Sequence, residues 1–190
     1  LWEVPYLPID PSDVGRSYEA VIRINSQSGK GGVAYLLEKD HGLSMPRRLQ
    51  IEFSQVIQKI ADESGKEISP SDIWDNFQET YLNSSGNYEF IEHHINSSSN
   101  KDGTQSDEIT IGLKHNTDIV SIIGRGNGPI DAMIDAIKKS FNLEIKISDY
   151  HQHAISSGSD AKAVAYSELV LGNKSVWGVG MHQNTVIAGL

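Results

Sequence analysis

The second half of the chain carries one pattern twice, and this repeat restricts the possible fold more than any other feature. Each copy has a strand, a long loop, a hairpin with a short polar turn, and a Gly-x-Gly motif that leads into the start of a helix. The motif is Gly124-Arg-Gly126 in one copy and Gly178-Val-Gly180 in the other, and the separation is typical of one β-β-β-α unit. We therefore predict an α+β fold in which two such units pair through their helices about a pseudo-twofold axis, with ligand sites favoured between the halves.

The first Gly-x-Gly motif lies in a strand-turn-helix pattern over residues 119–137. An apolar run ends in three glycines within five residues, and Pro129 then opens a helical pattern. Bare backbone N–H groups at a helix N-terminus favour a ligand with a carboxylate or phosphate. Turn chemistry alone also accounts for such glycines. No Gly-Lys-Ser/Thr follows the turn, and the third glycine comes too early for a dinucleotide-binding motif.

The preceding part of the chain predicts a small helical subdomain. A short apolar run at residues 33–38 indicates a strand, and an amphipathic pattern that begins near Pro46 predicts a helix that ends at Gly65. Ser69-Pro70-Ser-Asp72 has the residues of a capped helix start, so a second helix is expected after it. The polar stretch Asn83–Asn87 then marks the predicted domain boundary.

From Tyr88 the pattern changes to that of strands. Strands are predicted at residues 88–95, 108–114 and 143–147, with polar loops at 96–106 and from Asp149 through Asp160. Two hairpins are expected, with turns at His115–Asp118 and at Gly172–Lys174.

The composition narrows the class of partner. Sixteen Lys and Arg against 25 Asp and Glu give a net charge of −9, which argues against nucleic acid and anionic membranes as partners. The chain has no cysteine, so disulfides and thiolate metal sites are excluded and a cytoplasmic location is expected. No apolar run approaches the ~18–20 residues that span a bilayer. The apolar residues at both ends, Leu1–Leu7 and Ala188–Leu190, indicate a piece of a longer protein.

The titratable residues give no catalytic or metal-binding pattern. His93 and His94 are neighbours in a strand and point to opposite faces, so they cannot chelate one metal ion together. His151 and His153 have no third ligand in the pattern and are interpreted as surface histidines. The basic pairs Arg47-Arg48 and Lys138-Lys139 are interpreted as solvated helix faces.

Four separated segments resemble one enzyme family, in order along the chain. They are VPYLPIDP at 4–11, NSQSGKGGVAY at 25–35, DHGLSMPRRLQIEFS at 40–54 and GRGNGP at 124–129. The sequence is similar to the C-terminal part of 2-isopropylmalate synthase, and most similar to its long, actinobacterial-type branch. The resemblance implies residues 1–25 as the end of a first linker subdomain, 26–83 as a second (a strand and two helices), and 84–190 as a leucine-binding regulatory domain whose last helix is truncated.

The resemblance also implies the activity of the whole enzyme. An upstream (β/α)8 barrel would condense acetyl-CoA with 2-oxoisovalerate at a divalent metal ion (zinc, magnesium or manganese) in the first step of leucine synthesis. The barrel and its metal ligands are absent from this sequence, so the chain alone is expected to be inactive and to hold no cofactor. Its implied roles are binding of L-leucine as feedback inhibitor and homodimerisation.

Individual site residues follow from the resemblance alone. Tyr6 matches a linker tyrosine that reaches the active site of the partner subunit in the complete enzyme. Asp131 stands where the family usually has a small residue, and its charge would repel a carboxylate bound nearby. The residues that match leucine-binding positions are Gly126, Asn127, Gly128, Pro129, Ile130, Asp131, Ile147, Tyr150, Ala154, Ala161 and Ala163.

Two other functions remain open from the sequence. The chain could be the same region of a citramalate or homocitrate synthase with another effector. It could also be a purely structural dimerisation module.

Overall fold

The computed structural model describes residues 30–83, 86–99, 101–158 and 161–190. The helices are α1 (Lys30–His41), α2 (Arg47–Ser64), α3 (Pro70–Phe77), α4 (Pro129–Phe141) and α5 (Thr185–Gly189), and η2 (Gln78–Leu82) is a π-helical turn that continues α3. The strands are β1 (Tyr88–Ser99), β2 (Gln105–His115), β3 (Asp118–Gly126), β4 (Ile145–Ala154), β5 (Ala163–Leu171) and β6 (Lys174–His182). Tyr6 lies outside the described residues.

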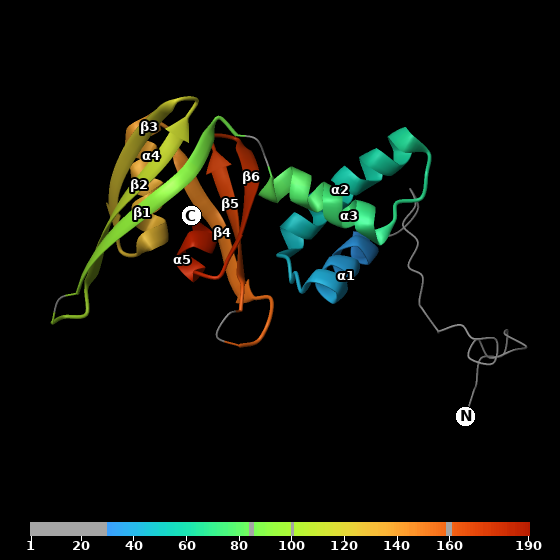
Figure 1. Cartoon of the computed structure of the whole chain (residues 1–190), viewed down its shortest axis with the longest axis horizontal. Coiled ribbons are helices and arrows are strands. Elements are labelled where there is room, and N and C mark those ends of the chain that lie inside the picture. Colours follow the sequence, from blue (N-terminus) through green and yellow to red (C-terminus); the bar gives the residue numbers. More distant parts are fainter. Residues whose placement is uncertain (1–29, 84–85, 100, 159–160) are drawn as a thin grey trace, which may run out of the picture.

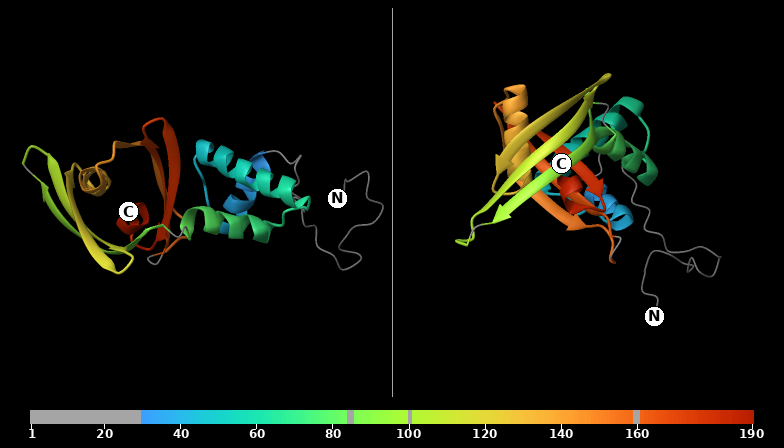
Figure 2. Two further views of the ribbon diagram at one scale, coloured as in Figure 1. Left: turned by 90° about the horizontal axis from the view of Figure 1, so that it is seen from above. Right: turned by 60° about the vertical axis from the view of Figure 1, so that its left-hand side comes forward.

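The elements form successive layers along the long axis of the molecule (Figure 1). Sheet β1–β3 comes first, helices α4 and α5 follow, then sheet β4–β6, and helices α1–α3 lie on the outer side of that second sheet (Figure 2). Each sheet is antiparallel with its second strand in the middle, and each is followed by a helix that packs on it. The α+β fold of two β-β-β-α units is therefore confirmed. No helix in these ranges is both long and apolar enough to cross a bilayer.

The observed strand register shows which glycines of the two units are equivalent, and the result differs from the predicted alignment of the Gly-x-Gly motifs. Gly124 pairs with Ile109 across β2 and β3, and Gly180 pairs with Ala165 across β5 and β6. Each of these glycines lies equally far beyond the hairpin turn of its own unit, at His115–Asp118 in one and Leu171–Lys174 in the other. Because the hairpin turns fix the register, Gly124 is equivalent to Gly180. The predicted alignment of Gly124 with Gly178 is therefore wrong.

The two equivalent glycines let each helix approach its own sheet closely. A Cβ atom on Gly124 would lie under 3.0 Å from the carbonyl oxygen of Ala132 in α4, and one on Gly180 would lie equally close to that of Ala188 in α5. Real Cβ atoms essentially never approach so closely. Each helix thus rests on bare strand backbone, which explains Gly124 and Gly180 without any ligand.

Sheet β4–β6 is covered on both faces. One face contributes Val164, Tyr166, Trp177 and Val179 to a core shared with α1–α3. On the other face, Ala163 and Ala165 pack against Ala188 of α5. The remaining members of the shared core are Val33, Leu36, Leu37, Leu43, Met45, Leu49, Phe53, Ile57, Ala61, Ile68, Ile73, Phe77 and Tyr81.

A separate core joins α4 to sheet β1–β3. Its centre is Ile109, Ile111 and Ile122 from the sheet, with Ala132 and Ala136 from the helix, all at most 4% exposed. The outer face of this sheet has no helical cover in the described part of the chain, and Ile119 and Ile123 are 73% and 53% exposed there.

The two predicted helices of the linker are confirmed with their caps. Gly65 ends α2 in the left-handed conformation, with φ of 64°. Ser69 and Asp72 form a reciprocal capping box at the start of α3.

The strand predicted at residues 33–38 is wrong, because these residues belong to helix α1. Val33, Leu36 and Leu37 are buried together, and their spacing of three and four residues is that of one helix face. This apolar run is only six residues long and lies between a predicted loop and a predicted turn, so its helical period cannot be recognised from the sequence. The described part of the predicted second linker subdomain therefore contains helices α1–α3, η2 and connecting loops, with a single β-bridge residue at Ile68 and no strand.

Two predicted loops are also largely strand. β1 and β2 continue as a long hairpin in which Asn96 pairs with Glu108 and Ser99 with Gln105. β4 continues to Ala154, beyond a bulge at Ser148 that shifts its register with β5. Both extensions tolerate polar side chains because much of their surface faces solvent. A strand of this kind has no alternation of apolar residues, so its sequence resembles that of a loop.

Candidate functional site

The glycine turn joins the end of β3 to the start of α4. Gly128 is the N-cap residue, in extended backbone conformation, and its carbonyl accepts a hydrogen bond from the N–H of Ala132 at 2.9 Å. A Cβ atom at Gly128 would have no neighbouring atom within 4 Å. At Gly126, by contrast, a Cβ atom would lie under 3.0 Å from the N–H nitrogen of Ala132 and from the Asp131 carboxylate. The turn is thus closed against α4 at Gly126 and open at Gly128.

Asp131 is explained by the hydrogen bonding of this turn. Its Oδ2 atom accepts a hydrogen bond from the backbone N–H of Asn127 at 3.0 Å. One turn further along α4, Oδ2 of Asp135 accepts from the N–H of Arg125 at 2.8 Å. Two acids of α4 therefore hold the end of β3, and an acid in the first helical turn also suits the helix dipole. The Asn127 N–H is already used in this arrangement.

Residues of both units meet beside this turn. The phenol oxygen of Tyr150 in β4 and the Cδ1 atom of Ile130 in α4 both lie under 3.0 Å from where a Cβ atom on Gly189 of α5 would be. Tyr150 donates a hydrogen bond to Gln152 at 3.1 Å, and Gln152 donates to the carbonyl of Thr185 at 2.7 Å. Burial raises the pKa of Tyr150 from its ordinary value, which further favours the protonated hydroxyl.

The other predicted wall residues are spread along β4 and β5. Ile147 packs against the core of α4 together with Ile130. Ala163 is buried, its register partner Ala154 is exposed, and Ala161 is half-buried. The structure thus brings together Ile130, Ile147 and Tyr150, while the alanines lie farther along the β4–β5 hairpin. Their assignment to a leucine site stays a prediction.

Tyr150 also lines a cavity of about 400 Å³ at the start of α2. The cavity lies between the first residues of α2 and the middle of β4, and its other lining residues are Ser44, Met45, Pro46, Arg47, Asp149 and His151. Beside it, Nε2 of His153 accepts a hydrogen bond from the backbone N–H of Ser44 at 3.2 Å. The predicted surface role is therefore wrong for His153, which is half-buried and joins the linker helices to the sheet.

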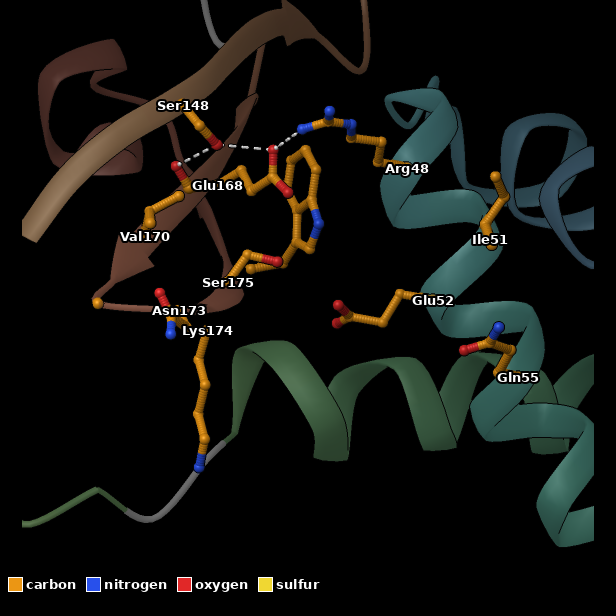
Figure 3. Close-up of a pocket in the computed structure, with 12 residues that line it drawn as sticks. Arg48, Ile51, Glu52, Gln55, Ser148, Glu168, Val170, Asn173, Lys174 and Ser175 are labelled. Atoms are coloured by element: carbon orange, nitrogen blue, oxygen red, sulfur yellow. Dashed lines mark hydrogen bonds and ion pairs between the residues drawn. The ribbon is translucent and has the colours of Figure 1, made fainter.

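A larger cavity of about 560 Å³ separates α2 from strands β5 and β6 (Figure 3). At its edge Nη1 of Arg48 donates to Oε2 of Glu168 at 2.8 Å, and Oγ of Ser148 donates to the same oxygen at 2.7 Å. Glu168 is only 4% exposed. The side chain of Arg48 is exposed, as predicted for a solvated helix face, and its pairing with a buried acid is an additional role that the sequence pattern did not indicate. The available signal was Glu168 itself, an acid inside the otherwise apolar and small run Ala163–Leu171.

The comparisons with known proteins cover the whole chain. Residues 67–190, more than half of it, match the model of the LeuA allosteric (dimerisation) domain, and residues 1–38 match that of the alpha-isopropylmalate synthase post-catalytic domain-like family. The chain is 50% identical to a 2-isopropylmalate synthase of Rhodospirillum rubrum and 50% identical to one of Mycobacterium leprae. Both alignments cover 100% of this chain but only 34% and 31% of these relatives.

A further 2-isopropylmalate synthase, from Brucella suis, is 46% identical over 100% of this chain and 34% of its own length. The chain thus spans about a third of the length of the curated relatives it matches. The domain model accounts for α3 and both β-β-β-α units. This chain belongs to the family of LeuA allosteric (dimerisation) domains.

Proposed function

We propose that this chain is the regulatory part of a 2-isopropylmalate synthase, which binds L-leucine as feedback inhibitor and joins two subunits. The observation that carries the proposal is the meeting of α4, β4 and α5 at Ile130, Tyr150 and Gly189, directly beside the open turn at Gly128. An isobutyl side chain needs an apolar wall that is already formed, and a carboxylate needs backbone N–H groups at a helix start.

The two ends of leucine fit different parts of this arrangement. Ile130, Ile147 and the ring of Tyr150 offer apolar surface, and the N-terminus of α4 offers the positive end of a helix dipole. Asp131 opposes the carboxylate through its charge and already takes the Asn127 N–H. We therefore infer that leucine binds here more weakly than it would with a small residue at this position.

The proposed activity belongs to the complete enzyme. It condenses acetyl-CoA with 2-oxoisovalerate at a divalent metal ion in an upstream barrel, in the cytoplasm, and the chain alone is inactive. In this scheme Tyr6 acts in the partner subunit's active site. Residues 1–25, 26–83 and 84–190 form the end of a first linker subdomain, a second linker subdomain and the regulatory domain. The support is the family match and the three synthases to which the chain is similar.

Calorimetric titration of leucine into this chain and into the full-length protein tests the ligand. We expect saturable heat with leucine and far weaker binding of alanine, which lacks the isobutyl group. Gly128→Asp is the matched probe, because a Cβ atom there has no neighbour within 4 Å and the change places a second acid at the turn. Gly178→Asp is its control, since that position is equally open but lies in β6.

Absence of heat with leucine at millimolar concentrations in both proteins would exclude a leucine site, and inhibition that is unchanged by Gly128→Asp would favour a purely structural dimerisation module. Assays of the full-length protein with 2-oxoisovalerate, pyruvate and 2-oxoglutarate test the substrate. Preference for either of the last two would point to a citramalate or homocitrate synthase.

A further inference from the structure

A buried ionised carboxylate connects the linker helices to the regulatory sheet. Glu168 lies within the central strand β5, and its Oε2 atom receives hydrogen bonds from Arg48 of α2 and from Ser148 of β4, at 2.8 and 2.7 Å. The hydrogen bond from Ser148, and after it the pairing with Arg48, hold the pKa of Glu168 below its usual value although the side chain is buried. The group is therefore charged at neutral pH.

The buried charge of Glu168 favours the one position of α2 in which Arg48 pairs with it. A buried carboxylate is unfavourable without partners, so movement of Arg48 away from Glu168 would leave a charge that only hydroxyl donors compensate. The side chain of Arg48 is 69% exposed, in contrast to that of Glu168 at 6%. The arginine can therefore leave without disturbing packing, whereas the acid cannot move without disturbing the sheet.

Ser148 links this pair to the proposed leucine wall. It is the extra residue at the bulge of β4, where the register with β5 shifts between Ile147 and Asp149. Ile147 precedes it and packs in the core of α4, and Tyr150, two residues on, contacts Gly189 of α5. A ligand that displaces Ile147 or Tyr150 therefore changes the backbone that positions the Ser148 hydroxyl.

The surroundings of Arg48 leave room for a change of position. The 560 Å³ cavity lies between the Arg48 face of α2 and the β5–β6 hairpin, so this face of the helix meets the sheet through a polar contact, while Leu49 on the neighbouring face packs in the shared core (Figure 3). One turn further along α2, Glu52 accepts a hydrogen bond from the hydroxyl of Tyr81 in η2 at 3.0 Å. A shift of α2 would therefore reach η2 and, through the shared core, helices α1 and α3.

We propose that the contact between Arg48, Glu168 and Ser148 transmits ligand binding from the regulatory domain to linker helices α1–α3. Arg48 and Ser148 are positioning residues in this scheme and touch no ligand. The inference rests on the proposed leucine site, and it assigns the route by which that site is coupled to the rest of the enzyme.

The test uses the full-length protein with Arg48→Gln, which removes the charge at an exposed position. Lys59→Gln is the matched control, because Lys59 lies on the same helix and its ion pair with Glu63 is exposed on both sides. Leucine affinity is measured by calorimetry, and residual activity is measured at saturating leucine. Hydrogen exchange of α2 is followed with and without leucine.

We expect Arg48→Gln to keep basal activity and to bind leucine, while residual activity at saturating leucine rises roughly 2- to 30-fold over wild type. The leucine-dependent change in exchange of α2 should disappear, Arg48→Lys should restore part of the inhibition, and Lys59→Gln should behave as wild type. Glu168→Gln is a second variant, and it should reproduce the loss of inhibition.

Two results would overturn the inference alone. One is full inhibition of Arg48→Gln at saturating leucine with an unchanged exchange response of α2. The other is loss of leucine binding in Arg48→Gln while wild type binds, since Arg48 would then support the site itself. Absence of leucine binding by the wild-type protein is a different outcome, which overturns the proposed function and this inference with it.

Discussion

The Asp131 carboxylate accepts a hydrogen bond from the backbone N–H of Asn127 at 3.0 Å and so closes the turn between β3 and α4. This contact orders the turn, and it also places a negative charge at the end of the helix where the leucine carboxylate is proposed to bind. Stability of the turn and affinity for an anionic group therefore oppose each other at one residue.

Asp131→Ala should tighten leucine binding by roughly 2- to 10-fold, because the Asn127 N–H becomes available and the repulsive charge is lost. The same change should lower the free energy of unfolding by about 0.3–1 kcal/mol through loss of the acid in the first helical turn. Calorimetry and urea unfolding of the same preparations measure the two effects. Asp131→Asn separates charge from hydrogen bonding, and weaker leucine binding in Asp131→Ala would contradict the proposed orientation.

Gly124→Ala and Gly180→Ala should each destabilise the fold by about 1–3 kcal/mol or more, since the new methyl group would meet helix backbone that cannot move freely. Gly178→Ala is the control, because a Cβ atom there has no neighbour within 4 Å. Urea unfolding midpoints of the three variants give the comparison. Equal midpoints for Gly180→Ala and Gly178→Ala would show that close packing of α5 on Gly180 does not contribute to the free energy of unfolding.

Asp135 should contribute stability that depends on pH. Hydrogen bonds from Lys139 and from the Arg125 N–H lower its pKa from the ordinary value of 3.8. A lowered folded-state pKa means that the contribution is complete above about 3.8 and is lost as the pH falls through the lower folded value. Asp135→Asn should therefore reduce the free energy of unfolding at pH 7 and have little effect once the pH lies below the lowered folded-state pKa of Asp135. The same deficit at both pH values would show that the carboxylate charge is not responsible.

Tyr166→Ala should destabilise the chain by about 3–5 kcal/mol, because this side chain is 0% exposed in the core between sheet β4–β6 and α1–α3. Ile119→Ala is the matched control on the uncovered sheet, where the residue is 73% exposed and the change should stay within about 0.5 kcal/mol. Thermal unfolding measures both variants. Hydrogen exchange should also rise in α1–α3 for Tyr166→Ala, and exchange confined to β4–β6 would argue against a shared core.

Local signals in the sequence are sufficient for much of the architecture. The capping box at Ser69, the left-handed Gly65 and the two hairpin turns all follow from neighbouring residues, so they could be predicted. The glycine turn is also placed correctly between a strand and a helix. Its role in close helix packing requires knowing what Gly124 and Gly180 face.

The wrong or missing predictions concern residues that are distant in sequence, or segments that are too short to show a helical or strand period. α1 has little more than three turns, so Val33, Leu36 and Leu37 could be read as a strand. Arg48 and Glu168 are 120 residues apart, and no local pattern indicates their pairing. The role of Asp131 depends on the direction of one side chain, which the sequence does not contain.

The two-sided cover of sheet β4–β6 has a consequence for how the chain can be divided. A fragment that began near Tyr88 would retain both β-β-β-α units but would place Val164, Tyr166, Trp177 and Val179 in water. The predicted boundary near residue 84 thus separates two sequence patterns, but one hydrophobic core contains residues from both sides of it. The second unit and the linker helices should melt together as one cooperative block, and the first unit is the part able to loosen by itself.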